Sequence, residues 1–133
     1  MSIKQGSNVL AGLQDISGKA NIDMDNISST GNEYIANCAM PSDRYVNLTL
    51  GSSGASYTAP ADGYVVFDKA SSGANQYIRM TTSDGLRVLN NSTGSGQYLA
   101  VFLPVKKNQQ FYVFYTAGGT TNSFRFVYAQ GAQ

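Results

Sequence analysis

The sequence predicts an all-β protein, a jelly-roll-like antiparallel β-sandwich of about eight short strands preceded by an extended or short-helical segment. Short segments that alternate apolar and polar residues recur along the chain, as strands require. Turns rich in Gly, Ser and Asn separate these segments, and the 133 residues include 14 Gly and 9 Tyr. Charged residues make up only 13% of the chain, about half the usual fraction.

The first part of the chain, residues 1–40, differs from the rest. It contains one aromatic residue, Tyr34, and more acidic than basic residues. We expect a stalk or junction segment whose spaced aliphatic residues pack only against sister chains, and a partly disordered leader is the alternative. Within it, Asn26–Ala39 is predicted to form a short helix capped by Ser29 or Thr30, with Glu33 in its first turn.

Residues 41–133 are predicted to form the β-domain, because Pro41 marks a change in composition. Its strand segments are rich in β-branched or aromatic residues and end at turn signals. They are Arg44–Leu50, Ser56–Thr58, Tyr64–Asp68, Gln76–Thr82, Leu86–Leu89, Tyr98–Val105, Phe111–Tyr115 and Phe124–Tyr128. This spacing is typical of a sandwich or small jelly roll, and an up-and-down meander is the main alternative.

The last two strands are predicted to form a β-hairpin, with Gly118-Gly119 supplying a positive φ at its tip. Side chains alternate along a strand, so Tyr112 and Phe114 point away from Phe111 and Val113. Both faces of this strand are therefore apolar, whereas a half-solvated sheet alternates apolar and polar residues. We expect Tyr112 and Phe114 to contact a second copy of the chain. An ordinary exposed surface is the alternative.

Few residues of the chain are of the types that catalyse reactions or bind metals. The chain has no His, which removes the commonest general base and transition-metal ligand. The single Cys38 is interpreted as a small apolar residue. Four carboxylates of the β-domain, Asp43, Asp62, Asp68 and Asp84, show no spacing that pairs them for glycoside hydrolysis or for metal binding. We therefore expect no enzymatic activity, no cofactor and no metal.

The net charge of +1 and the lack of a basic run argue against a nucleic-acid partner. No apolar stretch approaches the length of a membrane span, and the N-terminus shows no secretory signal pattern, so we expect no membrane insertion.

Recognition is the remaining function class. Loops of Ser, Asn, Thr and Gly near Tyr residues suit adaptable hydrogen bonding and stacking. The candidate loops are Gly51–Ala55, Ala70–Asn75, Asn90–Gly96 and Ala117–Asn122. Within them the candidate receptor contacts are Asn90, Asn91, Thr93, Thr121 and Asn122.

Two runs, YTAPADGYVVFDKA and LAVFLPVKKNQQFYVFYTAGGTTNSFRFVYAQG, resemble the C-terminal head domains of phage and prophage tail fibres. In that family an entry strand YTAPxDGYV and a strand PVKKGxxFYVxY recur near the chain end. The leader NIDMDNISSTGNEYIANCAMPS is similar to the junction between shaft and head. Asn108 departs from the family pattern, which more often has Gly at this place in the turn.

The resemblance implies a homotrimer whose subunits are jelly-roll sandwiches similar to adenovirus fibre heads and tumour-necrosis-factor-like trimers. It implies a virion tail fibre that is made in the bacterial cytoplasm without a signal peptide and acts outside the cell. Its function would be host attachment through a bacterial surface glycan or protein. A purely structural virion or trimerisation module and, at lower rank, a glycan-cleaving tail enzyme are the alternatives.

Overall fold

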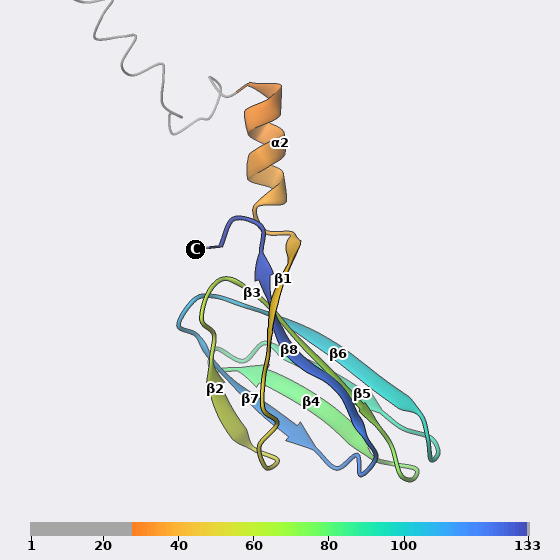
Figure 1. The fold of residues 1–133 in the computed structure, drawn as a ribbon. Helices are drawn as coiled ribbons and strands as arrows, with labels where there is room; N and C mark the ends of the chain where they lie inside the picture. Colours follow the sequence, from red (N-terminus) through yellow and green to blue (C-terminus); the bar gives the residue numbers. More distant parts are fainter. Residues whose placement is uncertain (1–27, 133) are drawn as a thin grey trace, which may run out of the picture. The chain divides into compact units, whose positions relative to one another are not determined.

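A computed structural model describes residues 28–132 of the chain (Figure 1). The chain divides into two units between Ala36 and Asn37, and each is described by itself. The predicted boundary at residue 41 stays a prediction, and the stalk proposed for residues 1–27 lies outside the described residues.

Helix α2 spans Ser29–Asn37. The N–H of Gly31 donates to Ser28 Oγ at 3.1 Å, so Ser28 is the N-cap. The helix was predicted, but its cap lies one residue before Ser29 and two before Thr30, the two expected caps. Because the helix begins at Ser29, no acidic residue falls in its first turn, and the expectation for Glu33 is wrong.

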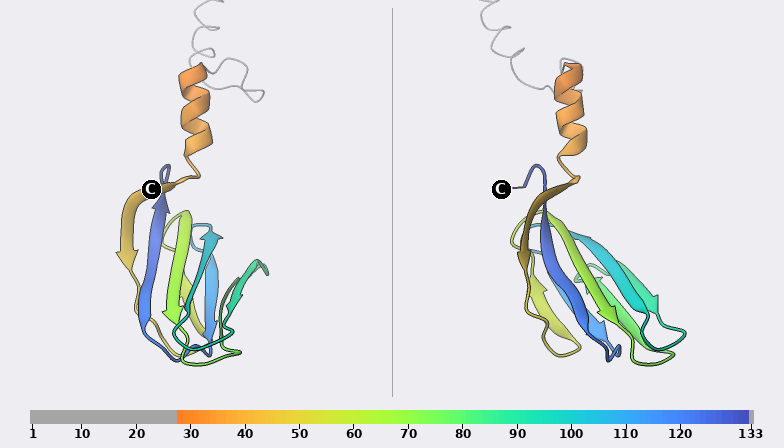
Figure 2. Two further views of the ribbon diagram at one scale, coloured as in Figure 1. Left: turned by 90° about the vertical axis from the view of Figure 1, so that its right-hand side faces the viewer. Right: turned by 45° about the vertical axis from the view of Figure 1, so that its right-hand side comes forward.

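The second unit is a sandwich of two four-stranded antiparallel sheets, which confirms the predicted all-β sandwich. The strands of both sheets run roughly along one direction in the two views of Figure 2. Sheet A has the order β1-β8-β3-β6 and sheet B the order β2-β7-β4-β5. The strands are β1 Pro41–Asn47, β2 Ala55–Thr58, β3 Gly63–Ala70, β4 Tyr77–Thr82, β5 Arg87–Asn91, β6 Tyr98–Val105, β7 Gln110–Tyr115 and β8 Thr121–Ala129.

The strand pairs are nested. Strand β1 pairs with β8, β2 with β7, β3 with β6 and β4 with β5. The chain therefore folds like one long hairpin whose closed end is the β4–β5 turn. Two further pairings, β3 with β8 and β4 with β7, join these pairs into the two sheets. Among the described strands, β4 and β5 are the only consecutive ones that pair, so an up-and-down meander is excluded for the sandwich.

The predicted C-terminal hairpin is wrong, because β7 and β8 lie in different sheets. Strand β7 finds partners in β2 and β4, and β8 lies between β1 and β3. The segment between them crosses from one sheet to the other. A Cβ on Gly119 would lie 2.6 Å from the carbonyl oxygen of Ala70, so a close approach requires glycine there. Neither Gly118 nor Gly119 has the predicted positive φ.

The core lies between the two sheets and is rich in aromatic side chains. Strand β3 alternates buried and half-buried residues along its whole length, as expected of a strand with one face in a core. Phe67 and Phe124 meet edge to face with ring centroids 5.4 Å apart, and Tyr57 stacks on Phe111 at 5.3 Å. Each such aromatic pair adds about 0.5–1.5 kcal/mol beyond its buried area.

Candidate binding surfaces

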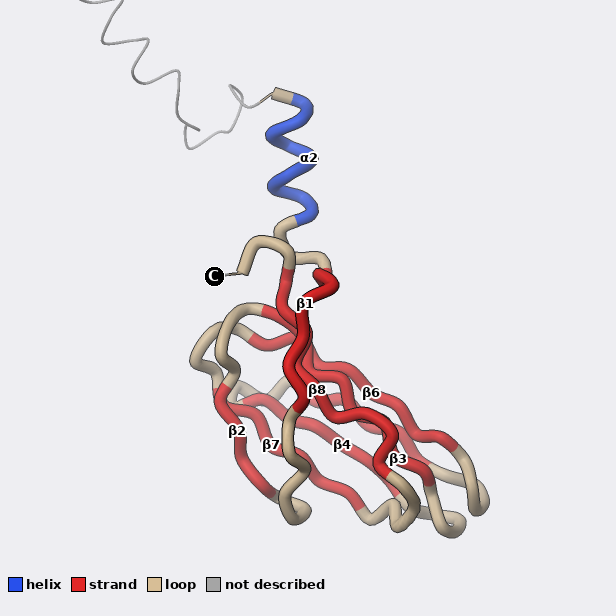
Figure 3. Tube along the Cα trace, in the orientation of Figure 1, coloured by secondary structure: helices blue, strands red, loops and turns tan. Residues whose placement is uncertain are grey.

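The four loops predicted from the sequence lie together at one end of the sandwich (Figure 3). In the structure they span residues 48–54, 71–76, 92–97 and 116–120. They come together because the strands are antiparallel and nested, so every second connection falls at the same end. We call this the loop end. The β2–β3, β4–β5 and β6–β7 turns lie at the other end.

Two buried serines tie the loops at residues 71–76 and 92–97 together. Ser71 and Ser92 are each 3% exposed. Ser92 Oγ accepts the N–H of Gln76 at 3.0 Å and donates to the Gly73 carbonyl oxygen at 2.7 Å. Ser71 Oγ donates to the Gly94 carbonyl oxygen at 2.6 Å, across to the other loop. The two loops are thus held as one hydrogen-bonded unit.

The side chain of Gln76 extends this network to the third loop. Its Oε1 accepts the N–H of Ser72 at 2.8 Å and the N–H of Gly118 at 3.2 Å. Thr116 adds a further link, because its Oγ1 accepts the N–H of Tyr77 at 2.9 Å. The polar loop end is therefore a fixed surface built by side chains that the sequence analysis did not single out.

Lys69 adds hydrogen bonds to the segment at residues 116–121 from the core side of β3. It is 9% exposed and lies on the core side of β3. Its Nζ donates to the Gly119 carbonyl oxygen at 2.6 Å and to Thr121 Oγ1 at 3.2 Å, and it lies 5.4 Å from the centroid of the Tyr115 ring. These contacts compensate for burying a cation.

The predicted receptor contacts fall into two groups. Asn91, Thr93 and Asn122 are exposed, and the amide of Asn122 donates to Asp68 Oδ1 at 3.3 Å. Thr121 is half-buried under the Lys69 bond, and Asn90 is half-buried with its amide donating to the Ala100 carbonyl oxygen at 3.3 Å. The three exposed residues are accessible to a partner, whereas Thr121 and Asn90 are half-buried. The receptor role of all five stays a prediction.

The outer face of sheet B collects aromatic residues around Arg79. Tyr112 and Phe114 lie there and are half-buried. Phe114 pairs with Arg79 across the strands, and the Arg79 Cζ lies 4.3 Å from the centroid of its ring and 5.9 Å from that of Tyr77. The outward aromatic surface of β7 is therefore partly covered within the subunit. The predicted subunit contact at Tyr112 and Phe114 stays a prediction.

The outer face of sheet A is more exposed and more apolar. Phe102 is 63% exposed and Tyr98 is 70% exposed, both on the edge strand β6. Phe102 lies beside Tyr64, with ring centroids 6.4 Å apart. The two rings border a groove of about 490 Å³, whose other lining residues are Pro41, Val66, Ala100, Val101 and Val127.

The carboxylates predicted not to form a catalytic pair make local contacts. Thr82 Oγ1 donates to Asp84 Oδ1, and this hydrogen bond is the main cause that lowers the pKa of Asp84 below its ordinary 3.8. Asp62 Oδ1 accepts the N–H of Lys107 at 2.8 Å. Within residues 28–132, no cluster of three or more His, Cys, Asp or Glu side chains that could hold a metal ion is found.

Comparison with known proteins finds no matching family model, no matching curated protein and no matching solved structure. In the described part of the chain, no helix is long and apolar enough to cross a membrane.

Proposed function

We propose that this chain is the homotrimeric, non-enzymatic receptor-binding head of a phage or prophage tail fibre, which attaches to a bacterial surface glycan or protein. The observation that carries this proposal is that the sandwich has two surfaces of different polarity. One is the apolar outer face of sheet A around Phe102, and the other is the polar, hydrogen-bonded loop end. The nested strand pairing also suits the jelly-roll fold that the resemblance to tail-fibre heads implies.

The apolar face supports self-association. Exposed apolar patches that adjoin a groove mark interaction sites, and a monomer would leave Phe102, Tyr98 and Tyr64 in water. A copy of the same chain is the simplest occupant, since the lining is uncharged. We therefore assign the subunit contact to the outer face of sheet A in preference to Tyr112 and Phe114, whose surface Arg79 already covers in part.

The loop end supports receptor binding. Thr93 in the loop at residues 92–97 is exposed, as are Asn91 at the end of β5 and Asn122 near the start of β8, and all three present hydrogen-bonding groups without charge. The buried bonds of Ser71 and Ser92 hold the backbone beneath them, so the surface is formed before binding and little ordering entropy is lost.

The mass of the full chain in solution tests the trimer. We expect three times the chain mass of 14.2 kDa by light scattering. Phe102→Asp should give monomers, because an aspartate in an apolar contact is costly. Leu89→Asp is the matched control, as Leu89 is 52% exposed on the opposite face. A monomeric parent protein refutes the trimer. Dissociation by Phe114→Asp but not by Phe102→Asp places the contact on sheet B, as the sequence analysis predicts.

Adsorption to host cells tests attachment. Replacing Asn91, Thr93 and Asn122 together by Ala should reduce adsorption while the trimer persists. Unchanged adsorption would favour the purely structural module. New reducing ends after incubation with host polysaccharide, lost on Asp→Asn substitution, would favour the glycan-cleaving alternative.

A further inference from the structure

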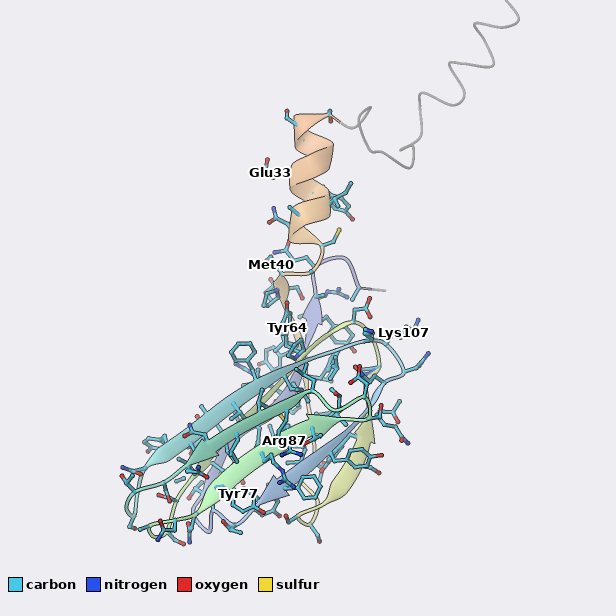
Figure 4. All side chains as sticks on the ribbon, turned by 180° about the vertical axis from the view of Figure 1, so that it is seen from behind. Glu33, Met40, Tyr64, Tyr77, Arg87 and Lys107 are labelled. Carbon is cyan, nitrogen blue, oxygen red and sulfur yellow. The ribbon has the colours of Figure 1, made fainter. Side chains whose placement is uncertain are left out.

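The outer face of sheet B carries positive charge that no acidic residue of the sheet offsets. Arg79 on β4 and Arg87 on β5 lie on this face, and strands β2, β4, β5 and β7 contain no Asp or Glu. Figure 4 shows Arg87 and Tyr77 on this side of the sandwich. The face therefore favours an anionic partner.

Arg79 is held in place without a hydrogen-bond partner for its Nε. This atom is buried and unpaired among the described residues. The guanidinium lies over Phe114 and near Tyr77, so its rotamer is restricted before any ligand arrives. A planar, pre-oriented guanidinium binds a carboxylate through two parallel hydrogen bonds, and little side-chain entropy is lost on binding.

The neighbours of Arg79 suit a sugar. Register places Thr81 beside Tyr112, and Ser56 on the other side of Tyr112, along one row of the face. Half-buried aromatic rings offer flat apolar surfaces against which the C–H faces of sugar rings pack. The uncharged hydroxyl groups between them can exchange hydrogen bonds with sugar hydroxyls.

We propose that the outer face of sheet B binds a glycan that bears carboxylate groups, with Arg79 pairing with the carboxylate and Tyr77, Tyr112 and Phe114 packing against the sugar rings. A guanidinium pairs with a carboxylate or with a phosphate, so the test below includes inorganic phosphate as a competing anion. This inference rests on the proposed function, for it names the receptor class and adds a second contact area beside the loop end. In a trimer three such faces would act together and raise the avidity.

Calorimetric titration of the full chain with a short oligouronate prepared from alginate tests the inference. We expect saturable binding that weakens about tenfold in Arg79→Gln, as expected for loss of one charge-assisted pair. Arg79→Lys should weaken binding by a smaller factor, because it keeps the charge and loses the planar fork. Lys107→Gln is the matched control, since it removes one positive charge from the exposed β6–β7 turn, and it should leave binding unchanged.

Three results would overturn the inference. They are no binding of the oligouronate, equal weakening by Arg79→Gln and Lys107→Gln, and equally tight binding of a neutral maltooligosaccharide that Arg79→Gln does not alter. Tighter binding of inorganic phosphate than of the oligouronate would also overturn the carboxylate assignment. If Arg79→Gln does not fold, the exposed Arg87→Gln decides, with weaker oligouronate binding expected and unchanged binding contradicting the inference.

Light scattering on the same samples keeps the two proposals apart. A monomer that still binds the oligouronate through Arg79 refutes the trimeric head and leaves this site standing. A trimer that adsorbs to cells but does not bind the oligouronate refutes this site alone.

Discussion

The Nζ of Lys69 lies 2.6 Å from the carbonyl oxygen of Gly119, which is 50 residues further along the chain. This bond joins the end of β3 in sheet A to the segment that crosses from sheet B to sheet A. Lys69 is 9% exposed, and its hydrogen bonds go to a carbonyl and a hydroxyl oxygen, with no carboxylate among them. The bond therefore fixes where the chain changes sheets.

Replacing Lys69 by Met should destabilise the sandwich. The Gly119 carbonyl loses its ammonium donor, and Thr121 loses the same partner, so we expect the free energy of unfolding to fall by about 1–3 kcal/mol. Urea denaturation followed by fluorescence measures this change. The control is Lys107→Met on the exposed β6–β7 turn. Equal urea midpoints of unfolding for both variants would show that the Lys69 hydrogen bond does not stabilise the protein.

Replacing Ser92 by Ala should loosen the loop end. The Gln76 N–H and the Gly73 carbonyl each lose a buried partner, at a cost of about 1–3 kcal/mol. Hydrogen exchange should become faster at the Gln76 amide. Ser95→Ala changes an exposed residue of the same loop and serves as the control. Unaltered protection at Gln76 in the Ser92 variant would contradict the network described here.

Asn108 occupies a left-handed backbone conformation, with a φ of 67°. Gly and Asn tolerate this region, whereas Ala pays a steric penalty of about 1–2 kcal/mol there. Asn108→Gly should therefore keep or raise the melting temperature, and Asn108→Ala should lower it. Equal melting temperatures for the Gly and Ala variants would argue against the conformation.

Asp84 should make stability depend on pH in acid. Its pKa is lowered in the folded protein below the ordinary 3.8, chiefly by the hydrogen bond from Thr82. The unfolded chain therefore binds this proton more readily. The stabilisation is present above pH 3.8 and is lost as the pH falls through the folded pKa. Asp84→Asn should show a smaller fall in melting temperature over this acid range, and a fall identical to that of the parent protein would refute the role of Asp84.

The strands were predictable because their signal is local. Alternation and turn residues placed all eight, and Tyr98–Val105 has the predicted bounds. The partner of each strand was not predictable in the same way. Strands β7 and β8 are consecutive, aromatic and joined by a Gly-rich segment, so they read as a hairpin, yet each finds its partners in a different sheet.

The residues of the candidate sites also differ in whether the sequence could predict their positions. Alternation along β3 places Lys69 on the side of Val65 and Phe67, so its burial could have been inferred from sequence. Nothing local distinguishes the buried Ser71 and Ser92 from exposed serines of the same loops. The position of Arg79 over Phe114 depends on the register between β4 and β7, which only the folded chain reveals.

The nested pairing also bears on how the protein is made. Strand β8, Thr121–Ala129, is the last of the eight described strands in sequence order, and it lies between β1 and β3 in sheet A. During synthesis β1 has no partner until β8 has been made, and β3 exposes one edge for the same period. Unpaired edges invite pairing with other chains. Nascent chains translated next to one another on one messenger RNA would therefore meet while β1 and one edge of β3 are still unpaired.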